Sequence, residues 1–498
     1  MAAQPASFRV YNTRTRRTED FEPIVPNCVG LYVCGMTVYA DTHIGHARAM
    51  IIFDAFVRYL RHRGWKVKFV RNFTDIDDKI IREAAKTGEE PIELAQRFID
   101  RFHEEMAMLG LKPPDAEPRV STSIDEIVSM TARLVEKGHA YPAEGSVWFS
   151  VPSNPNYGAL SHQKVEELRS EDLGEKRHPA DFALWKAAKP GEPAWESPWG
   201  PGRPGWHIEC SAMAEKELGE TIDIHGGGLD LVFPHHENEV AQSECVHGKR
   251  YANVWMHNGL LVMESGEKMG KSMGNAIAIR KLLEAYPSEA IRLYHLQDHY
   301  RSAVPWKGVR SLDESLGKLG RLYEAREVAE SMKGEEDADK VAEALGADAL
   351  KVLELARGFD EAFYAALDND FNTSQALGHA LEIARAINRL SNHKKAQRRA
   401  GPVVAPALTA LGRLSESLGL LTLSSEEFQA EIKAKRLPVL GITVEQVEGL
   451  LEERTSARGD KNWARADAIR DELEQHSIVV MDRPHGSEWR VRLGSLDA

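Results

Sequence analysis

Four residues that lie far apart in the sequence have the side-chain types that proteins use to bind zinc. Cys34 and Cys210 offer thiolates, and His235 and Glu239 offer an imidazole and a carboxylate. His235 and Glu239 are four positions apart, a spacing that puts two side chains on the same face of a helix. Together the four form an acceptable zinc shell. Two alternatives stay open: His236 competes with His235, and the cysteines are also compatible with buried thiols that pack as small hydrophobic groups.

Two histidines stand where a polyanion could bind. His43 and His46 flank Gly45 at the junction between an apolar strand expected at 29–33 and a helix expected at 44–61. A helix start offers free backbone N–H groups and the positive end of the helix dipole. The pattern therefore indicates a phosphate-binding junction, although one such histidine is often only a polar helix cap.

Two further stretches have residues suited to a nucleotide. Gly226, Gly227 and Gly228 follow a strand expected at 222–225, and glycines there let the backbone lie flat against a ring or a sugar. Lys268 and Lys271 occur in the Gly-containing string 267–275, and lysines suit a phosphate whose charge grows in a transition state. A solvated lysine loop is the alternative for the second stretch.

The helices and strands expected around these residues predict an open α/β sheet. Strands at 29–33 and 67–70 around the helix at 44–61 form a parallel crossover unit, whose ligands bind at the carboxyl ends of the strands. The stretch from about 124 to 205 reads as an insertion with a short helix and aromatic strands. Helices expected at 312–332, 338–367, 371–391 and 405–418 fit a bundle, and a helix pair with a hairpin follows residue 443.

Composition sets limits on the class of protein. The chain has 498 residues, 42% hydrophobic and 28% charged, so we expect a globular protein of several domains. The net charge of -13 opposes nucleic-acid binding on average but allows a local basic face. No apolar run approaches the ~20 residues of a membrane helix, and the first residues lack the apolar core of an export signal. Four cysteines without an export signal indicate thiols or metal ligands in a reducing compartment.

The order of these motifs resembles the class I aminoacyl-tRNA synthetases, which activate an amino acid with ATP. The string His-Ile-Gly-His comes first, Lys-Met-Gly-Lys-Ser follows the last strand, and a helical region comes after both. Within the class, the chain is similar to the cysteinyl-tRNA synthetases over nearly its whole length. Two positions differ from the usual sequence of that family: Gly270 stands where the family has a serine, and Ala40 where it often has an aspartate. The matching stretches are 32–35, 37–39, 43–48, 71–72, 74–79, 181–186, 205–211, 225–239, 370–373, Trp463, Asp467 and Trp489.

The resemblance implies a fold of the α/β class. It is a Rossmann-like parallel-sheet catalytic domain with an inserted α+β connective domain, followed by a helical bundle and a small C-terminal anticodon-binding domain. The expected boundaries are 1–118 and 205–257 for the two halves of the catalytic domain, 119–204 for the insertion, 258–309 for the junction with the signature loop, 310–420 for the bundle and 435–498 for the anticodon-binding domain.

The resemblance also implies roles for individual residues. Zinc at Cys34, Cys210, His235 and Glu239 is expected to select cysteine through its thiolate. Catalysis is expected from His43, His46, Lys268 and Lys271, with ATP also bound by Gly45, Gly226, Gly227, Gly228 and Asp230. Asp230 contacts either the ribose or the substrate amine. The cysteine-binding residues are expected to be Gly35, Thr37, Thr74, Trp206 and His207, and the anticodon-reading residues Arg458, Trp463, Asp467 and Asp482.

The partners that the resemblance implies are L-cysteine, ATP with Mg²⁺ and cysteine tRNA, in a cytoplasmic enzyme without a membrane partner, with a monomer favoured. Two alternatives remain. A cysteine ligase of the mycothiol pathway shares the catalytic half but lacks the C-terminal module that begins here near Thr443. A non-catalytic synthetase paralogue would bind tRNA or zinc only, and the histidines and lysines at both signatures argue against it. For Trp463 alone, a core position is as compatible as base stacking.

Overall fold

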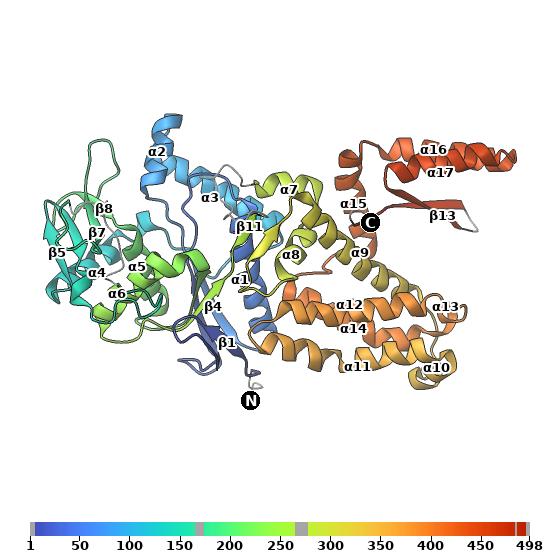
Figure 1. Ribbon diagram of the computed structural model, residues 1–498, viewed down its shortest axis with the longest axis horizontal. Coiled ribbons are helices and arrows are strands. Elements are labelled where there is room, and N and C mark those ends of the chain that lie inside the picture. Colours follow the sequence, from blue (N-terminus) through green and yellow to red (C-terminus); the bar gives the residue numbers. More distant parts are fainter. Residues whose placement is uncertain (1–4, 165–173, 264–276, 484–485, 495–498) are drawn as a thin grey trace.

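The central sheet consists of four parallel strands in the order β10–β9–β3–β4 (Figure 1). The computed structural model describes residues 5–164, 174–263, 277–483 and 486–494. Helix α1 (Ile44–His62) makes the crossover from β3 to β4, so the predicted strand–helix–strand unit is confirmed. The four strands are β3 (Cys28–Val33), β4 (Lys66–Arg71), β9 (Ile222–Gly228) and β10 (Ala252–Asn258).

Strand β3 sends its side chains alternately to the two faces of the sheet, as the pleat of a strand requires. Leu31 and Val33 lie in the hydrophobic core that contains much of α1. Tyr32 and Cys34 lie in a second core, together with residues of α5 (Trp206–Leu218). The alternation thus carries Cys34, the first residue after β3, to the face of the sheet that α5 covers.

Between β4 and α5 the chain forms two helices and then an inserted α+β segment, which the sequence predicted. The segment contains a four-stranded antiparallel sheet in the order β5–β6–β7–β8. This sheet lies at the opposite end of the molecule from the helical bundle (Figure 1). Asp78, at the start of α2, pairs with Arg203 and lies 2.8 Å from Lys186 Nζ, which ties α2 to this sheet. The elements are α2 (Asp78–Thr87), α3 (Pro91–Met108), α4 (Ile124–Glu136), β5 (Ala140–Ala143), β6 (Ser146–Phe149), β7 (Phe182–Ala187) and β8 (Gly202–Pro204).

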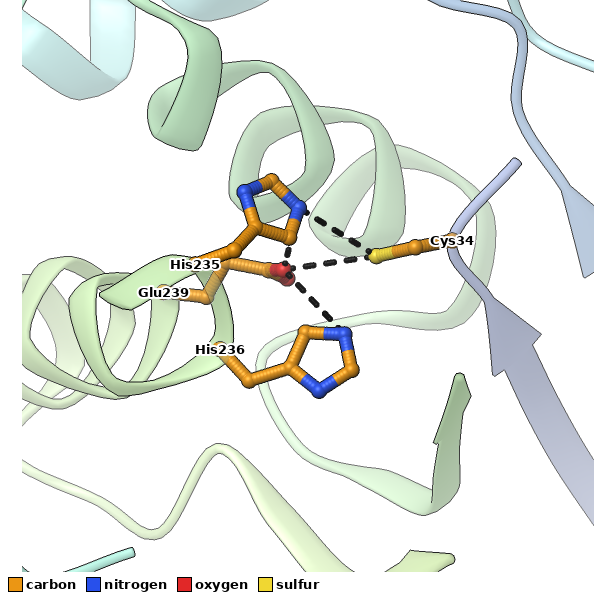
Figure 2. A group of neighbouring side chains, drawn as sticks. All are labelled: Cys34, His235, His236 and Glu239. Atoms are coloured by element: carbon orange, nitrogen blue, oxygen red, sulfur yellow. Dashed lines mark hydrogen bonds and ion pairs between the residues drawn. The ribbon is translucent and has the colours of Figure 1, made fainter. Parts of the chain in front are cut away.

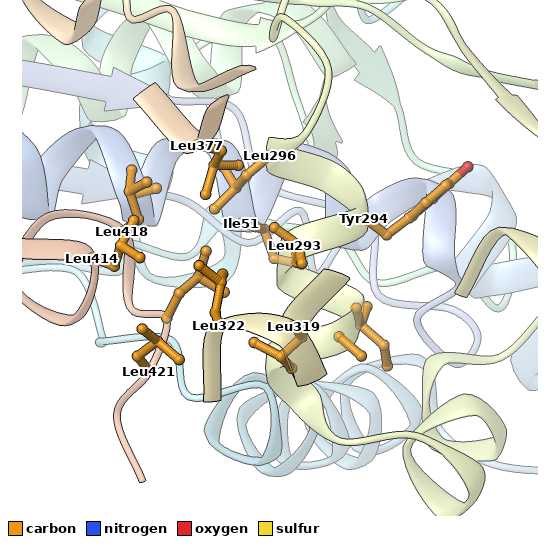
Figure 3. Close-up of a cluster of buried hydrophobic side chains, with 14 of the residues drawn as sticks. Ile51, Leu293, Tyr294, Leu296, Leu319, Leu322, Leu377, Leu414, Leu418 and Leu421 are labelled. Carbon is orange, nitrogen blue, oxygen red and sulfur yellow. The ribbon is translucent and has the colours of Figure 1, made fainter. Parts of the chain in front are cut away.

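The predicted helical bundle follows the sheet and shares its core with α1. Ile51 of α1, Leu293 of α8 and Leu319 of α9 lie in one buried cluster with Leu377 and Leu414 (Figure 3). The prediction of a single helix at 338–367 is wrong, because the helix ends before Gly346, where φ is 91°, and a second helix begins after it. The helices are α7 (Ile279–Ala285), α8 (Ser288–Leu296), α9 (Val309–Ser331), α10 (Ala338–Leu345), α11 (Ala347–Asp368), α12 (Thr373–Leu390), α13 (Ala396–Arg399) and α14 (Gly401–Leu418).

A small C-terminal unit ends the chain and lies apart from the central sheet (Figure 1). It contains the predicted helix pair and hairpin, preceded by α15, which the sequence reading missed. The missed signal is a capping box, in which Ser424 and Glu427 bond to each other's backbone. The elements are α15 (Ser425–Leu440), α16 (Val444–Gly459), α17 (Trp463–Gln475), β13 (Ile478–Arg483) and β14 (Gly486–Val491).

Two short strand pairs complete the fold. An antiparallel hairpin, β1 (Arg9–Asn12) and β2 (Arg17–Asp20), packs beside β10 through a hydrogen bond from Thr13 N to Trp255 O. Strands β11 (Leu261–Met263) and β12 (Val304–Trp306) pair in parallel next to α1. In the described part of the chain, no helix is both long enough and apolar enough to span a membrane.

Candidate metal centre and active site

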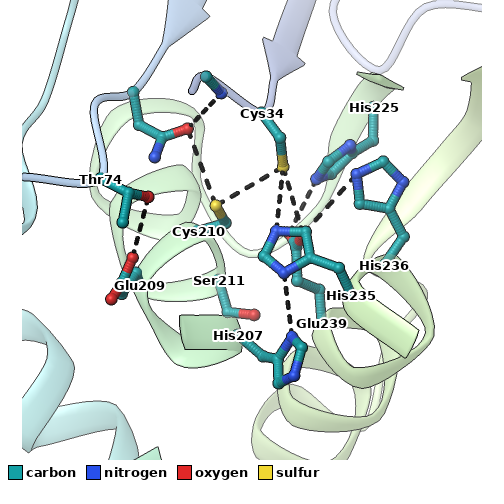
Figure 4. A network of polar contacts seen from close by, with 12 residues as sticks. Cys34, Thr74, His207, Glu209, Cys210, Ser211, His225, His235, His236 and Glu239 are labelled. Carbon is teal, nitrogen blue, oxygen red and sulfur yellow. Dashed lines mark hydrogen bonds and ion pairs between the residues drawn. The ribbon is translucent and has the colours of Figure 1, made fainter. Parts of the chain in front are cut away.

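Four elements bring the predicted zinc ligands to one buried place. Cys34 follows β3, Cys210 lies in α5, and Glu239 lies in the first turn of α6 (Glu237–His247). His235 was predicted on the helix with Glu239, but it lies in the kinked segment Val232–His236 that leads into α6, where Phe233 is non-helical. The four side chains point toward one another (Figure 4), and each residue is at most 6% exposed.

The distances between the donor atoms fit an ion-sized site. Cys34 Sγ lies 3.5 Å from Cys210 Sγ, 3.4 Å from His235 Nε2 and 3.4 Å from Glu239 Oε1. His235 Nε2 lies 3.0 Å from Glu239 Oε1. Ligand atoms about 2.0–2.3 Å from a tetrahedral zinc ion stand roughly 3.3–3.8 Å apart. The cluster is therefore slightly tighter than a filled zinc site and could open around an ion by a few tenths of an ångström.

The protonation of the cluster also suits a dication. Burial raises the pKa of the Cys34 thiol, and the hydrogen bond from Cys34 lowers the pKa of Cys210 to about 6. Burial opposes the charge on His235, but the Glu239 carboxylate and the Cys210 thiolate raise the pKa of His235 to about 10. Protons on Cys34 and His235 thus hold two acidic groups together, and a metal ion would replace them.

Neighbouring residues hold the proposed ligands in place. Oε2 of Glu239 lies 2.8 Å from His225 Nε2 and accepts a hydrogen bond of 3.1 Å from the Tyr251 hydroxyl, which leaves Oε1 directed at Cys34 and His235. His235 Nδ1 lies 3.0 Å from His207 Nδ1. Such partners orient metal ligands and are a usual part of metal centres. The sequence reading missed them because no local pattern marks these long-range contacts.

His236 meets the cluster from another side (Figure 2). A ring nitrogen of His236 and donor atoms of Cys34, His235 and Glu239 all lie within 4.8 Å of one another. However, Nδ1 of His236 lies 2.7 Å from His257 Nε2, and its Nε2 is 3.9 Å from Glu239 Oε1, farther than that of His235. The geometry therefore favours His235 as the nearer ligand.

Two of the residues expected to contact cysteine, Trp206 and His207, lie directly against His235. Trp206 is 36% exposed and stacks on the His235 ring, with centroids 4.4 Å apart. Thr37 and Thr74 pair as a parallel bridge between two loops, and the Thr74 hydroxyl donates to the buried Glu209 at 3.1 Å. A side chain at Gly35 would collide with the carbonyl of residue 72, which explains the glycine by close packing.

The His-Ile-Gly-His string starts α1, as predicted. The Nδ1 atom of His43 accepts hydrogen bonds from Gly45 N at 3.1 Å and His46 N at 3.3 Å. A neutral His43 therefore carries its proton on Nε2. The two histidine rings stack with centroids 3.6 Å apart. A Cβ at Gly45 would press on the His43 ring, so the glycine leaves room for this capping histidine.

The glycines at the end of β9 also have packing reasons. A Cβ at Gly226 would come within 2.5 Å of the Phe53 ring, and one at Gly227 within 2.8 Å of the His236 ring. At Gly228 the obstacle is Asp230, whose own position is exposed. The ring contacts explain Gly226 and Gly227 without a ligand, whereas the exposed Asp230 side chain could move away from a Cβ at Gly228, and the nucleotide role of all three glycines stays a prediction. Lys268 and Lys271 lie outside the described residues.

Comparisons with known proteins identify the family. Residues 20–313 match the model of the "tRNA synthetases class I (C) catalytic domain". Residues 362–422 match the DALR domain, and residues 443–490 match the "Cysteinyl-tRNA ligase anticodon binding domain". A cysteine–tRNA ligase of Geobacter metallireducens is 45% identical over 98% of this chain and 100% of its own length. The chain belongs to the cysteine–tRNA ligase family.

Other relatives agree with this placement among the cysteine–tRNA ligases. The cysteine–tRNA ligase of Alkalilimnicola ehrlichii is 48% identical over 97% of this chain and 99% of its own. Among solved structures, methionyl-tRNA synthetase of Mycobacterium tuberculosis with methionyl-adenylate aligns with a TM-score of 0.59 at 15% identity, covering 84% of this chain and 95% of that one. This likeness shows the class I synthetase fold, as predicted.

In the C-terminal unit of this cysteine–tRNA ligase family member, the residues expected to read an anticodon are exposed. Trp463 is 58% exposed at the first position of α17, so it is not a core residue. Asp467 is exposed one turn later on the same helix. Asp482 accepts hydrogen bonds from Arg458 at 2.6 Å and from Arg454 at 2.8 Å, a pairing with Arg454 that the sequence reading missed.

Proposed function

We propose that this protein activates L-cysteine with ATP and transfers the cysteinyl group to the 3′ end of cysteine tRNA. The position of Cys34 Sγ, 3.4–3.5 Å from donor atoms of Cys210, His235 and Glu239 in a chain of this family, is the observation that carries the proposal. In the first step, a carboxylate oxygen of cysteine attacks the α-phosphorus of ATP and pyrophosphate leaves. In the second, a ribose hydroxyl of the tRNA attacks the carbonyl carbon of the adenylate and AMP leaves.

The proposed metal is one Zn²⁺ ion held by Cys34, Cys210, His235 and Glu239. The donor set of two sulfurs, one nitrogen and one oxygen fits this ion. When bound, zinc would supply a Lewis acid that prefers a thiolate to a hydroxyl, which distinguishes cysteine from serine. His225 and Tyr251 would fix the orientation of the carboxylate that faces the ion.

The proposed cysteine pocket uses residues around this cluster. Trp206 and His207 would close over the substrate side chain, since the Trp206 ring already covers His235. Gly35, Thr37 and Thr74 would face the rest of the amino acid. These roles account for the exposed tryptophan, whose large apolar face otherwise meets water.

The proposed ATP site lies at the start of α1. His43 can donate its Nε2 proton to a phosphate oxygen, and the His46 side chain would bind the same polyanion near the positive end of the helix, where Gly45 leaves room beside the His43 ring. Lys268 and Lys271 would stabilise the leaving pyrophosphate, in an electrostatic mechanism without a protein nucleophile. Gly226, Gly227, Gly228 and Asp230 would face the nucleoside, with Mg²⁺ bound to ATP.

The proposed anticodon contacts are Arg458, Trp463, Asp467 and Asp482. An exposed tryptophan at a helix start suits stacking on an unpaired base, and arginine and aspartate suit base edges. We further propose a cytoplasmic monomer and the division of the chain into domains at 1–118, 119–204, 205–257, 258–309, 310–420 and 435–498.

Two assays test the proposal together. Cysteine-dependent exchange of pyrophosphate into ATP separates an enzyme from a non-catalytic paralogue. Charging of cysteine tRNA separates a synthetase from a ligase that joins cysteine to an amino-sugar. We expect both activities, and the absence of exchange with cysteine present would refute the proposal.

A further inference from the structure

Arg48 is a fully buried cation on α1 whose guanidinium contacts backbone carbonyl groups alone, within the part of the chain that the structure describes. Its exposed fraction is 0%. Burial lowers the pKa of Arg48 to about 10, so the side chain still carries its charge at neutral pH. A charge in such a place is costly unless all its donors are satisfied. The acceptors, at 2.7–3.3 Å, are the carbonyls of Gly259, His295, His299, Tyr300 and Ser302.

These carbonyls belong to two segments that lead into β11 and β12. Gly259 precedes β11, and Ser302 precedes β12. Gly259 N donates to Tyr300 O at 2.8 Å, and a Cβ at Gly259 would stand 2.2 Å from Ser302 O. The two backbones are therefore in direct contact. The His295 carbonyl lies in the last turn of α8, where unpaired carbonyls form the negative end of the helix dipole. Arg48 thus binds the start of β11, the start of β12 and the end of α8 to α1.

The first turn of α1 is fixed to the chain at a second point. Ile44 N donates to Ile277 O at 3.0 Å, and Ile279 N donates to Thr42 O at 2.9 Å. These bonds flank His43 and anchor the chain just after residue 276, whereas Arg48 anchors it just before β11.

We propose that Arg48 is a positioning residue for ATP, because it sets β11 and β12 at a fixed distance from the His-Ile-Gly-His turn. The proposal rests on the proposed function of that turn. None of the five carbonyls belongs to a proposed metal ligand or to a residue expected to contact cysteine. Loss of the arginine should therefore change the use of ATP and leave the binding of cysteine and zinc intact.

The test compares Arg48→Lys with Arg292→Lys in the full-length protein. Arg292 is an equally buried arginine, 1% exposed, that joins α8 to Asp54 of α1 and to Leu418 O. The lysine variants keep the charge but cannot reach all the acceptors. For Arg48→Lys we expect kcat/KM for ATP in pyrophosphate exchange to fall about 10- to 100-fold, the loss typical of a displaced reacting group. The KM for cysteine and the zinc content should stay within twofold of wild type.

Arg292→Lys should lower the melting temperature without changing kcat/KM for ATP. Gly259→Ala, which forces the two backbones apart while Arg48 remains, should reproduce the ATP defect and serves if Arg48→Lys does not fold. Equal effects of Arg48→Lys on ATP and cysteine, or unchanged ATP kinetics, would overturn the proposal. An inactive wild type would instead reject the proposed function, so the two failures are distinguishable.

Discussion

The sulfur atoms of Cys34 and Cys210 lie 3.5 Å apart, although 176 positions separate the residues in the chain. A disulfide would bring them to about 2.05 Å, and both cysteines are free thiols. Cys34 reaches this place because the alternation of β3 turns it toward α5. The separation is slightly shorter than the roughly 3.8 Å between two sulfur ligands of one zinc ion, and His235 and Glu239 lie 3.4 Å from the same Cys34 sulfur.

The two adjacent histidines should differ in their importance for metal binding. His235→Gln removes the nitrogen that lies 3.4 Å from Cys34 Sγ, and we expect this variant to lose its zinc. His236→Gln should retain zinc, because His236 is held by His257 instead. Zinc content measured by mass spectrometry after dialysis against a chelator checks both. Zinc loss from His236→Gln alone would reverse the assignment.

Trp463 should matter for tRNA and not for stability. Since Trp463 is 58% exposed, Trp463→Ala should change the free energy of unfolding by less than about 0.5 kcal/mol. Lost stacking of about 1–3 kcal/mol predicts a roughly 5- to 150-fold lower kcat/KM for tRNA charging. Pyrophosphate exchange should stay at the wild-type rate, and Trp463→Phe should recover most of the charging. Equal charging by the alanine variant would exclude the stacking role.

The ion pairs of Asp78 should stabilise the protein in a pH-dependent way. Partial burial alone would raise its pKa, but Lys186 and Arg203 lower the pKa of Asp78 to about 2. A carboxylate whose folded pKa is depressed contributes stability above its unfolded pKa of about 3.9 and loses it as pH falls toward 2. The gap in urea midpoint between wild type and Asp78→Asn should be constant from pH 5 to 8 and shrink to about half by pH 3.

The difference in free energy of unfolding between wild type and Asp78→Asn should also be small, because surface ion pairs contribute at most about 1 kcal/mol. Asp20→Asn serves as the control, since the Asp20 side chain is 85% exposed and lies 3.5 Å from its partner Arg9. A gap for Asp78→Asn that widens in acid would contradict the assigned direction of the pKa shift.

The core that joins the bundle to α1 should be sensitive to truncation. Leu319 is fully buried in the cluster of Figure 3, so Leu319→Ala should cost about 2–5 kcal/mol through lost burial and a cavity. Leu350, on α11, is 46% exposed, and Leu350→Ala should cost less than about 0.5 kcal/mol. Urea unfolding followed by circular dichroism measures both. Similar losses for the two variants would mean that the described packing does not govern stability.

Local patterns predicted the sheet and the bundle, and they picked out four residues that the structure brings close to one another, while their role as zinc ligands stays a prediction. The helix of residues 44–62 and the four-residue spacing of His235 and Glu239 are visible in the sequence, since each depends on periodicity or on side-chain type. The roles of Tyr251 and Arg48 are not, because their partners come from remote segments. Likewise, Gly226 looked like a ligand contact, but its immediate reason is the Phe53 ring beside it.

In the proposed mechanism, a metal ion at these four ligands selects the thiol of cysteine. The most direct measurement is pyrophosphate exchange with cysteine and with serine, together with zinc content, in wild type and in Cys210→Ser. Cys245→Ser, which changes a half-buried thiol outside the cluster, is the matched control. We predict one zinc ion and strong cysteine preference in wild type and in the control, and loss of both zinc and cysteine activation in Cys210→Ser. A Cys210→Ser protein without zinc that still activates cysteine and rejects serine would show that the metal does not select the substrate.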